Sequence, residues 1–132
     1  MTEELRPLLD HTSLSVDDLE QAKRFYEKAL APLGIVCVAD MKSPKDEVRF
    51  CGFGIGRKGS LWLVASGKQT PPSHICFRAR SRDEVDAFYK EALAAGGTCN
   101  GKPGTRPDYH PEYYAAFVRD LEGHNIEAVT FN

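Results

Sequence analysis

An internal repeat restricts the fold of this chain more than any other feature of its sequence. When the sequence is shifted by 63 residues, His11–Gly34 lies over His74–Gly97 without a gap, and seven of the 24 aligned positions are identical. Average residue usage gives only about one or two identities by chance. Each copy has a short apolar segment headed by histidine, then a helical segment containing Phe-Tyr, then glycine. The repeat therefore predicts two similar structural modules.

Apolar residues spaced three and four positions apart predict one helix in each module. Asp17 or Asp18 can cap the first helix, because an aspartate oxygen accepts the free amide protons of the first turn, and Gly34 ends it. In the second module Ser81 is the predicted cap, and Glu84, three residues later, completes a capping box.

Short apolar or alternating segments predict four strands in each module, so each module has the order βαβββ. Neither module is large enough to bury its sheet face alone, so the two must pack together, within one chain or across a dimer. We expect a single domain over residues 1–132, with module 1 at about 8–67 and module 2 at about 73–131. Between the strands, Gly101–Glu112 is predicted to be a polar, proline-rich loop. The predicted strands are Leu8–Val16, Ile35–Met41, Val48–Ile55, Ser60–Ala65, Ser73–Ala79, Thr98–Asn100, Tyr113–Arg119 and Asn125–Phe131.

Composition and charge exclude several classes of partner. The net charge is −2, so no basic field exists to hold nucleic acid or an anionic membrane. No apolar run approaches the roughly 20 residues of a membrane span, and no secretory signal is visible at the start. We therefore expect a cytoplasmic protein that binds a small molecule, with no nucleic acid and no membrane partner.

Two histidines and one glutamate are candidate metal ligands. His11 and His74 head equivalent strands in the two copies, and Glu127 lies in a last strand that is otherwise apolar or small. A carboxylate there must be solvated, paired or bound to a cation, because burying it alone is costly. Two imidazoles and one carboxylate can occupy one face of a divalent ion and leave positions open. Taken singly, each of these residues is more often a satisfied polar or surface residue; the repeat favours the metal site, because a pseudo-twofold arrangement would bring His11 and His74 together.

Other residues could line a substrate pocket, although each also has a structural alternative. Arg49 and Arg78 interrupt apolar strands and could bind an anion, whereas a surface position is the default for arginine. Cys76 should face the same way as His74. His124, in the last turn, is expected at the surface. The candidate pocket residues are Ser13, Arg49, Trp62, Cys76, Tyr109 and Tyr114.

Two segments carry a family resemblance. One is Asp10–Leu19, followed by Phe25-Tyr26, and the other is Phe117–Glu127, which is similar to the pattern F-x-x-D-P-D-G-N-x-I-E. In these segments the chain resembles the vicinal oxygen chelate superfamily, which holds glyoxalases, bleomycin-resistance proteins, extradiol dioxygenases and fosfomycin-resistance thiol transferases. The resemblance implies an α+β fold in which two βαβββ modules form an incomplete, curled mixed β-sheet barrel around a cleft.

The resemblance also implies a divalent metal at the base of that cleft and a homodimer. Carried over residue by residue, His11, His74 and Glu127 match the metal ligands of the family. The ion could be manganese, iron, nickel or zinc, and the sequence does not choose among them.

The predicted function is that of a metal-dependent enzyme acting on a small molecule chelated through its oxygens. Lyase, thiol transferase and dioxygenase chemistry stay open. Classical glyoxalase I enzymes use a further glutamate in the fourth strand, and Ser60–Ala65 contains no carboxylate. The alternative is a non-catalytic protein that sequesters a small molecule, as bleomycin-resistance proteins do, without a metal.

Overall fold

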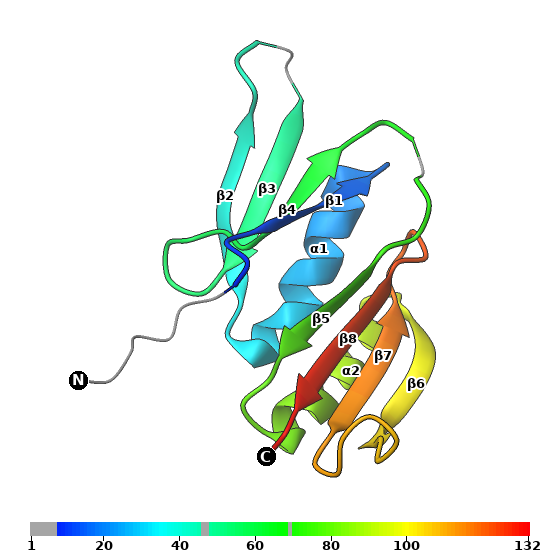
Figure 1. Ribbon diagram of the computed structural model, residues 1–132. Helices are drawn as coiled ribbons and strands as arrows, with labels where there is room; N and C mark the ends of the chain where they lie inside the picture. The colour runs from blue at the N-terminus through cyan, green and yellow to red at the C-terminus, as the bar shows by residue number, and fades with distance from the viewer. Residues whose placement is uncertain (1–7, 46–47, 69) are drawn as a thin grey trace, which may run out of the picture.

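The computed structural model describes residues 8–45, 48–68 and 70–132, and its elements repeat the order βαβββ (Figure 1). A short 3-10 helix, η1, directly follows the first helix. The first module contains β1 (Thr12–Val16), α1 (Leu19–Leu30), η1 (Ala31–Leu33), β2 (Val36–Lys42), β3 (Arg49–Gly54) and β4 (Leu61–Ala65). The second contains β5 (His74–Arg78), α2 (Arg82–Ala94), β6 (Thr98–Thr105), β7 (Tyr114–Arg119) and β8 (Asn125–Thr130).

Each module forms its own four-stranded mixed sheet. The strand orders are β1-β4-β3-β2 and β5-β8-β7-β6. In each sheet the first and last strands of the module pair in parallel, and the remaining pairs are antiparallel. The sheets do not close into a barrel, and the predicted α+β fold with two βαβββ modules is confirmed.

Two strand predictions were wrong in extent. β1 begins at Thr12 rather than Leu8, because its neighbour β4 begins at Leu61, the partner of Thr12, and offers no hydrogen bonds to earlier residues. β6 continues to Thr105, well into the predicted loop. Pro103 is tolerated there because β6 is an edge strand, and the pairing with β7 shifts register on both sides of Gly101.

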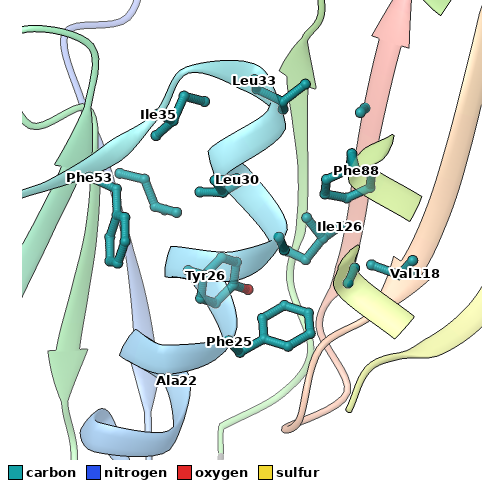
Figure 2. Packing of buried hydrophobic residues seen from close by; sticks show 14 of the residues in the cluster. Ala22, Phe25, Tyr26, Leu30, Leu33, Ile35, Phe53, Phe88, Val118 and Ile126 are labelled. Atoms are coloured by element: carbon teal, nitrogen blue, oxygen red, sulfur yellow. The ribbon is translucent and has the colours of Figure 1, made fainter. Parts of the chain in front are cut away.

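The core lies where the two helices meet each other and their sheets. α1 and α2 are in contact, and α1 places Phe25 and Tyr26 toward Phe88 and Ile126 of the second module (Figure 2). Both predicted N-caps form, since Asp18 accepts from the Gln21 amide at 3.1 Å and Ser81 from the Glu84 amide at 3.2 Å. The Glu84 carboxylate accepts from the Arg80 amide at 2.9 Å rather than from Ser81, so the predicted capping box is not completed. Within the described part of the chain, no helix has both the length and the apolar character to cross a membrane.

Each sheet packs one face on the helices and leaves the other open. On β5, Ile75 and Phe77 pack against the core, whereas His74, Cys76 and Arg78 are exposed. Strand side chains alternate between faces, so β8 turns Ile126 and Ala128 to the core and Glu127 to the open side. We call this surface the open face of the second sheet.

The turn between β7 and β8, residues 120–124, joins the second module to the first. Asp120 is buried and accepts a hydrogen bond of 2.5 Å from the Tyr26 hydroxyl. The Glu122 carboxylate accepts from the backbone amides of Asp17, at 2.7 and 2.9 Å, and Asp18, at 3.1 Å, just before α1. Both carboxylates therefore bind groups of the other module.

The expectation that His124 is exposed was wrong, because only 1% of this residue is accessible. Its Nδ1 accepts from the Ser73 amide at 2.9 Å, so the hydrogen must be on Nε2, which lies 3.3 Å from the Ser15 carbonyl oxygen. His124 thus binds the segment before β5 and the strand β1 at once.

Candidate metal centre

A histidine and a glutamate meet on the open face of the second sheet. The parallel register of β5 and β8 pairs His74 with Asn125 and Cys76 with Glu127. The His74 Nε2 atom lies 3.1 Å from Glu127 Oε1. Two cis ligands that are each about 2.1 Å from an ion are about 3 Å apart, so this separation suits neighbouring ligands of one metal.

The hydrogen bonding of His74 also suits a metal ligand. Its Nδ1 lies 2.9 Å from the carbonyl oxygen of Asn125, which can only accept, so Nδ1 carries a hydrogen. In the neutral ring the Nε2 lone pair then faces a carboxylate oxygen, and the two repel unless a proton or a cation lies between them. A backbone carbonyl that fixes the other ring nitrogen is the usual outer partner of a metal-binding histidine.

Glu127 is almost completely enclosed, with only 3% of the residue exposed. Its Oε2 accepts a short hydrogen bond from the Tyr113 hydroxyl. Phe117 of β7 lies opposite Glu127 in the sheet, and its ring stacks on His74 with centroids 6.3 Å apart. One carboxylate oxygen is therefore held by the protein, and the other faces His74.

The buried charge of Glu127 affects its neighbours. Burial raises the pKa of the Tyr113 hydroxyl, and the hydrogen bond to Glu127 and its charge raise it further. Although Cys76 as a residue is exposed, desolvation of its thiol by nearby protein atoms, and then the charge of Glu127, raise the pKa of this thiol. Both groups therefore keep their protons at neutral pH, and Tyr113 can act as a hydrogen-bond donor to Glu127.

His11 lies apart from this pair but borders the same hollow as His74. A hollow of about 1080 Å³ between β1 and β5 is lined by both histidines and by Cys76. The His11 Nδ1 atom is 2.7 Å from a carboxylate oxygen of Asp10, which in turn contacts Lys58 at 2.5 Å. Lys58, and then His11, hold the pKa of Asp10 below its usual value. In the part of the chain that the structure describes, no three His, Cys, Asp or Glu side chains are close enough together to hold a metal.

Ser13 and Trp62 face each other in the first sheet. They are paired in the β1–β4 register, and the Trp62 ring lies over Gly52 and Gly59, where added Cβ atoms would come within 2.7 and 2.8 Å of it. Ser13 is equivalent in the repeat to Cys76, the residue paired with Glu127. Trp62 therefore occupies, in the first sheet, the position that Glu127 occupies in the second.

The structure does not bring Arg49 or Tyr114 to the His74–Glu127 pair. Arg49 binds Glu20 at 2.5 Å and Asp40 at 3.1 Å on the surface of the first module. Tyr114 points to the helix side of its sheet and donates to Asp86 of α2 at 2.7 Å.

Tyr109 lies in the loop after β6, beside Tyr113, with ring centroids 5.2 Å apart. Tyr113 and Phe117 were not among the predicted site residues, although both contact the pair directly. Strand alternation could have found them, because residues 113, 115 and 117 share one face and residue 117 lies opposite residue 127 across the turn.

Comparisons with known proteins agree with this architecture. A crystal structure of a glyoxalase/bleomycin resistance protein from Albidiferax ferrireducens T118 is similar with a TM-score of 0.76 and 29% identity, covering 94% of this chain and 98% of that one. A lactoylglutathione lyase from Agrobacterium tumefaciens gives a TM-score of 0.66 at 23% identity, covering 96% of both chains. A glyoxalase/bleomycin resistance protein/dioxygenase family enzyme from Burkholderia phytofirmans PsJN gives 0.68 at 16%, covering 93% of this chain and 98% of the other.

The comparison with curated proteins gave no significant match. The structures from Agrobacterium tumefaciens and Burkholderia phytofirmans PsJN are less than 25% identical to this chain, so they establish only a common fold. The family model described as Glyoxalase/Bleomycin resistance protein/Dioxygenase superfamily matches residues 8–128, nearly the whole chain. The chain belongs to the glyoxalase/bleomycin resistance protein/dioxygenase superfamily.

Proposed function

We propose that this protein is a metal-dependent enzyme that binds a small molecule through adjacent oxygen atoms. In this proposal His74 and Glu127 hold a divalent ion, and His11 of the partner subunit in a homodimer is the third ligand. The observation that carries the proposal is the geometry of the pair, with Nε2 and Oε1 3.1 Å apart and each side chain fixed from behind.

Exposed surface supports a site shared between two copies. The open face of the second sheet leaves His74 about half exposed, and His11 is similarly exposed in the first module. Large apolar side chains at the border of the hollow are also exposed, namely Leu8, Leu9 and Ile55. Exposed apolar patches of this kind commonly mark protein–protein interfaces. A second copy would cover them and could bring its His11 to the pair.

A bound divalent ion would act as a Lewis acid, polarising substrate oxygens and stabilising negative charge that develops on them. The protein holds the ligands in position. The Asn125 carbonyl fixes the ring of His74, Phe117 stacks on it, and Tyr113 orients Glu127 by donating to Oε2.

The fourth strand argues against a classical glyoxalase I reaction. β4 contains no carboxylate, and Trp62 occupies the position equivalent to Glu127. Proton transfer in the classical lyases needs a base at that strand. Thiol transfer and oxygen insertion remain compatible with three protein ligands.

Metal analysis tests the proposal directly. We expect protein purified without chelator and loaded with Mn²⁺ or Zn²⁺ to hold about one ion per site, measured by mass spectrometry and by titration calorimetry. His74→Ala and Glu127→Gln should abolish this binding, and His11→Ala should weaken it. His110→Ala is the matched control, because this histidine lies in the exposed loop. Equal metal content in the wild type and His74→Ala, or none in either, would overturn the proposal.

A non-catalytic binding protein is the second candidate, and the character of the hollow favours it. Its walls include Ile35, Phe53, Leu61, Ile75 and Phe77, so an apolar ligand could bind without a metal. Ligand screening by thermal shift separates the candidates. A binding protein would be stabilised equally with and without chelator, whereas the proposed enzyme would respond to its substrate only when metal is present.

A further inference from the structure

We propose that the substrate of this site is a small dianionic acid, and that Arg78 and Arg106 bind its charged groups. The inference rests on the proposed function, since it names the substrate class of the same His74–Glu127 site. The observation behind it is that two guanidinium groups stack on aromatic rings linked to the pair: Arg106 on Phe117, which stacks on His74, and Arg78 on Phe131, which contacts Tyr113.

Arg78 lies on the open face of β5, two residues beyond Cys76 and therefore on the same side as His74. Its guanidinium carbon is 5.1 Å from the centre of the Phe131 ring. Phe131 in turn contacts Tyr113, with centroids 5.4 Å apart. Because Tyr113 donates to Glu127, Arg78 is connected to the candidate metal ligand through only two aromatic side chains.

Arg106 occupies the other side. Its guanidinium carbon is 5.5 Å from the centre of the Phe117 ring, which stacks on His74. The Arg106 Nη2 atom donates to the Lys102 carbonyl oxygen at 2.7 Å and Nη1 to the Thr105 carbonyl oxygen at 3.4 Å, so the end of this side chain is fixed and its Nε–H and second Nη hydrogens are left for a ligand. Gly101 and Gly104 make room for it, since a Cβ at either position would lie 3.3 or 3.2 Å from the guanidinium nitrogens.

Neither guanidinium forms an ion pair with any Asp or Glu in the described ranges, whereas Arg49 and Arg80 both do. Stacking on an aromatic face stabilises the cation and leaves donors at the edge of the guanidinium available. Those donors match a carboxylate or phosphate group in geometry and charge. Two such cations beside one site thus point to an anionic ligand.

The charge balance of the proposed site points the same way. A divalent ion bound by one carboxylate keeps a single net positive charge, and Arg78 and Arg106 each add one more. With a neutral substrate only solvent would offset these three positive charges, whereas an anion could bind them directly. A dianion with an oxygen next to one of its carboxylates could chelate the ion and still offer a second carboxylate to an arginine.

Titration calorimetry with malate and with its uncharged dimethyl ester tests the inference. Malate has the required arrangement, a hydroxyl beside one carboxylate and a second carboxylate further along. We expect Mn²⁺-loaded protein to bind malate at least about tenfold more tightly than the ester, and Arg78→Gln and Arg106→Gln each to weaken malate binding by about tenfold or more. Arg78→Lys should retain part of the affinity. Arg24→Gln, on the exposed side of α1, should change nothing.

Two further readouts separate this inference from the proposed function. The Mn²⁺ affinity of the arginine variants should equal that of the wild type, which shows that their site is folded. If malate and the ester bind alike, or if Arg78→Gln and Arg106→Gln both bind malate as the wild type does, the inference is wrong even though metal binding stands. If the wild type binds no metal but its arginines still bind malate in the presence of chelator, the proposed function fails and the anion site remains.

Discussion

The hydrogen bond from the Tyr26 hydroxyl to Asp120 joins the two modules, and its removal should lower the stability of the protein by a measurable amount. Asp120 accepts three hydrogen bonds, one from the Tyr26 hydroxyl at 2.5 Å and two from the backbone amides of Glu122 and His124 at 2.9 Å. Replacement of Asp120 by alanine leaves all three donors without their acceptor. Because hydrogen bonds to a charged group contribute about 1.5–3 kcal/mol each and do not add fully, we expect Asp120→Ala to lower the free energy of unfolding by about 4 kcal/mol.

Tyr26→Phe is the milder change, because it removes one donor and leaves Asp120 with its two backbone partners. We expect it to lower the free energy of unfolding by about 1.5 kcal/mol. The matched control is Tyr89→Phe, the equivalent residue in the repeat, which lies beside Cys99 and is only partly buried, so its loss should matter little. Urea unfolding followed by circular dichroism measures all three, and for a domain of this size each kcal/mol shifts the melting temperature by roughly 3–4 °C.

The same bond predicts a dependence on pH. Burial, and then the charge of Asp120, raise the pKa of Tyr26 well above its usual value of 10.0. Its contribution to stability is therefore present below about pH 10 and is lost as the pH rises further, because the unfolded chain ionises while the folded chain cannot. The difference between wild type and Tyr26→Phe should shrink above pH 10. If this difference is independent of pH, or if Tyr89→Phe costs as much as Tyr26→Phe, the argument that Tyr26 joins the modules is wrong.

Three further substitutions test local packing. Gly52→Ala would place a Cβ 2.7 Å from the ring of Trp62, so we expect the fluorescence of this single tryptophan to shift and the free energy of unfolding to fall by about 1–3 kcal/mol. Ser81→Ala removes the cap of α2 and should cost about 1 kcal/mol in urea unfolding, with Ser81→Asp retaining most of the stability. Gly97→Ala places a Cβ 2.9 Å from a backbone oxygen of β7 and should reduce the melting temperature by several degrees, whereas an unchanged value would show that β7 can move away.

The repeat predicted the architecture well because both copies obey the same local rules. Each needs a capped amphipathic helix and four short strands, and those requirements can be recognised in the sequence. The repeat could not predict where the copies differ. Gly34 adopts a left-handed conformation with φ of 76° at the end of η1, whereas Gly97, its equivalent, is needed because neighbouring atoms leave no space for a Cβ. Identical residues therefore serve different physical purposes.

Contacts between the modules were the least predictable part. Neither the buried position of His124 nor the docking of Glu122 on the first helix follows from the local pattern, because both depend on how one module packs on the other. A smaller difference has a local origin, which strand alternation explains. Tyr114 was predicted for the pocket, but the neighbouring Tyr113 contacts Glu127, because adjacent residues of a strand point to opposite faces.

The two sheets differ at one equivalent position, which holds Trp62 in the first sheet and Glu127 in the second. This difference would give the proposed metal centre three protein ligands, drawn from both modules, rather than four. The second sheet places a carboxylate opposite Cys76, beside the histidine that heads β5, whereas the first sheet has Trp62 at the equivalent position. Two modules with a histidine and a carboxylate each would supply four ligands to a shared ion. With tryptophan in one of them, the first module can offer only His11, and the ion would keep one more position for substrate oxygens. Replacing Trp62 by glutamate should then raise metal affinity at the expense of substrate binding, whereas an unchanged metal affinity would show that the two positions do not face one ion.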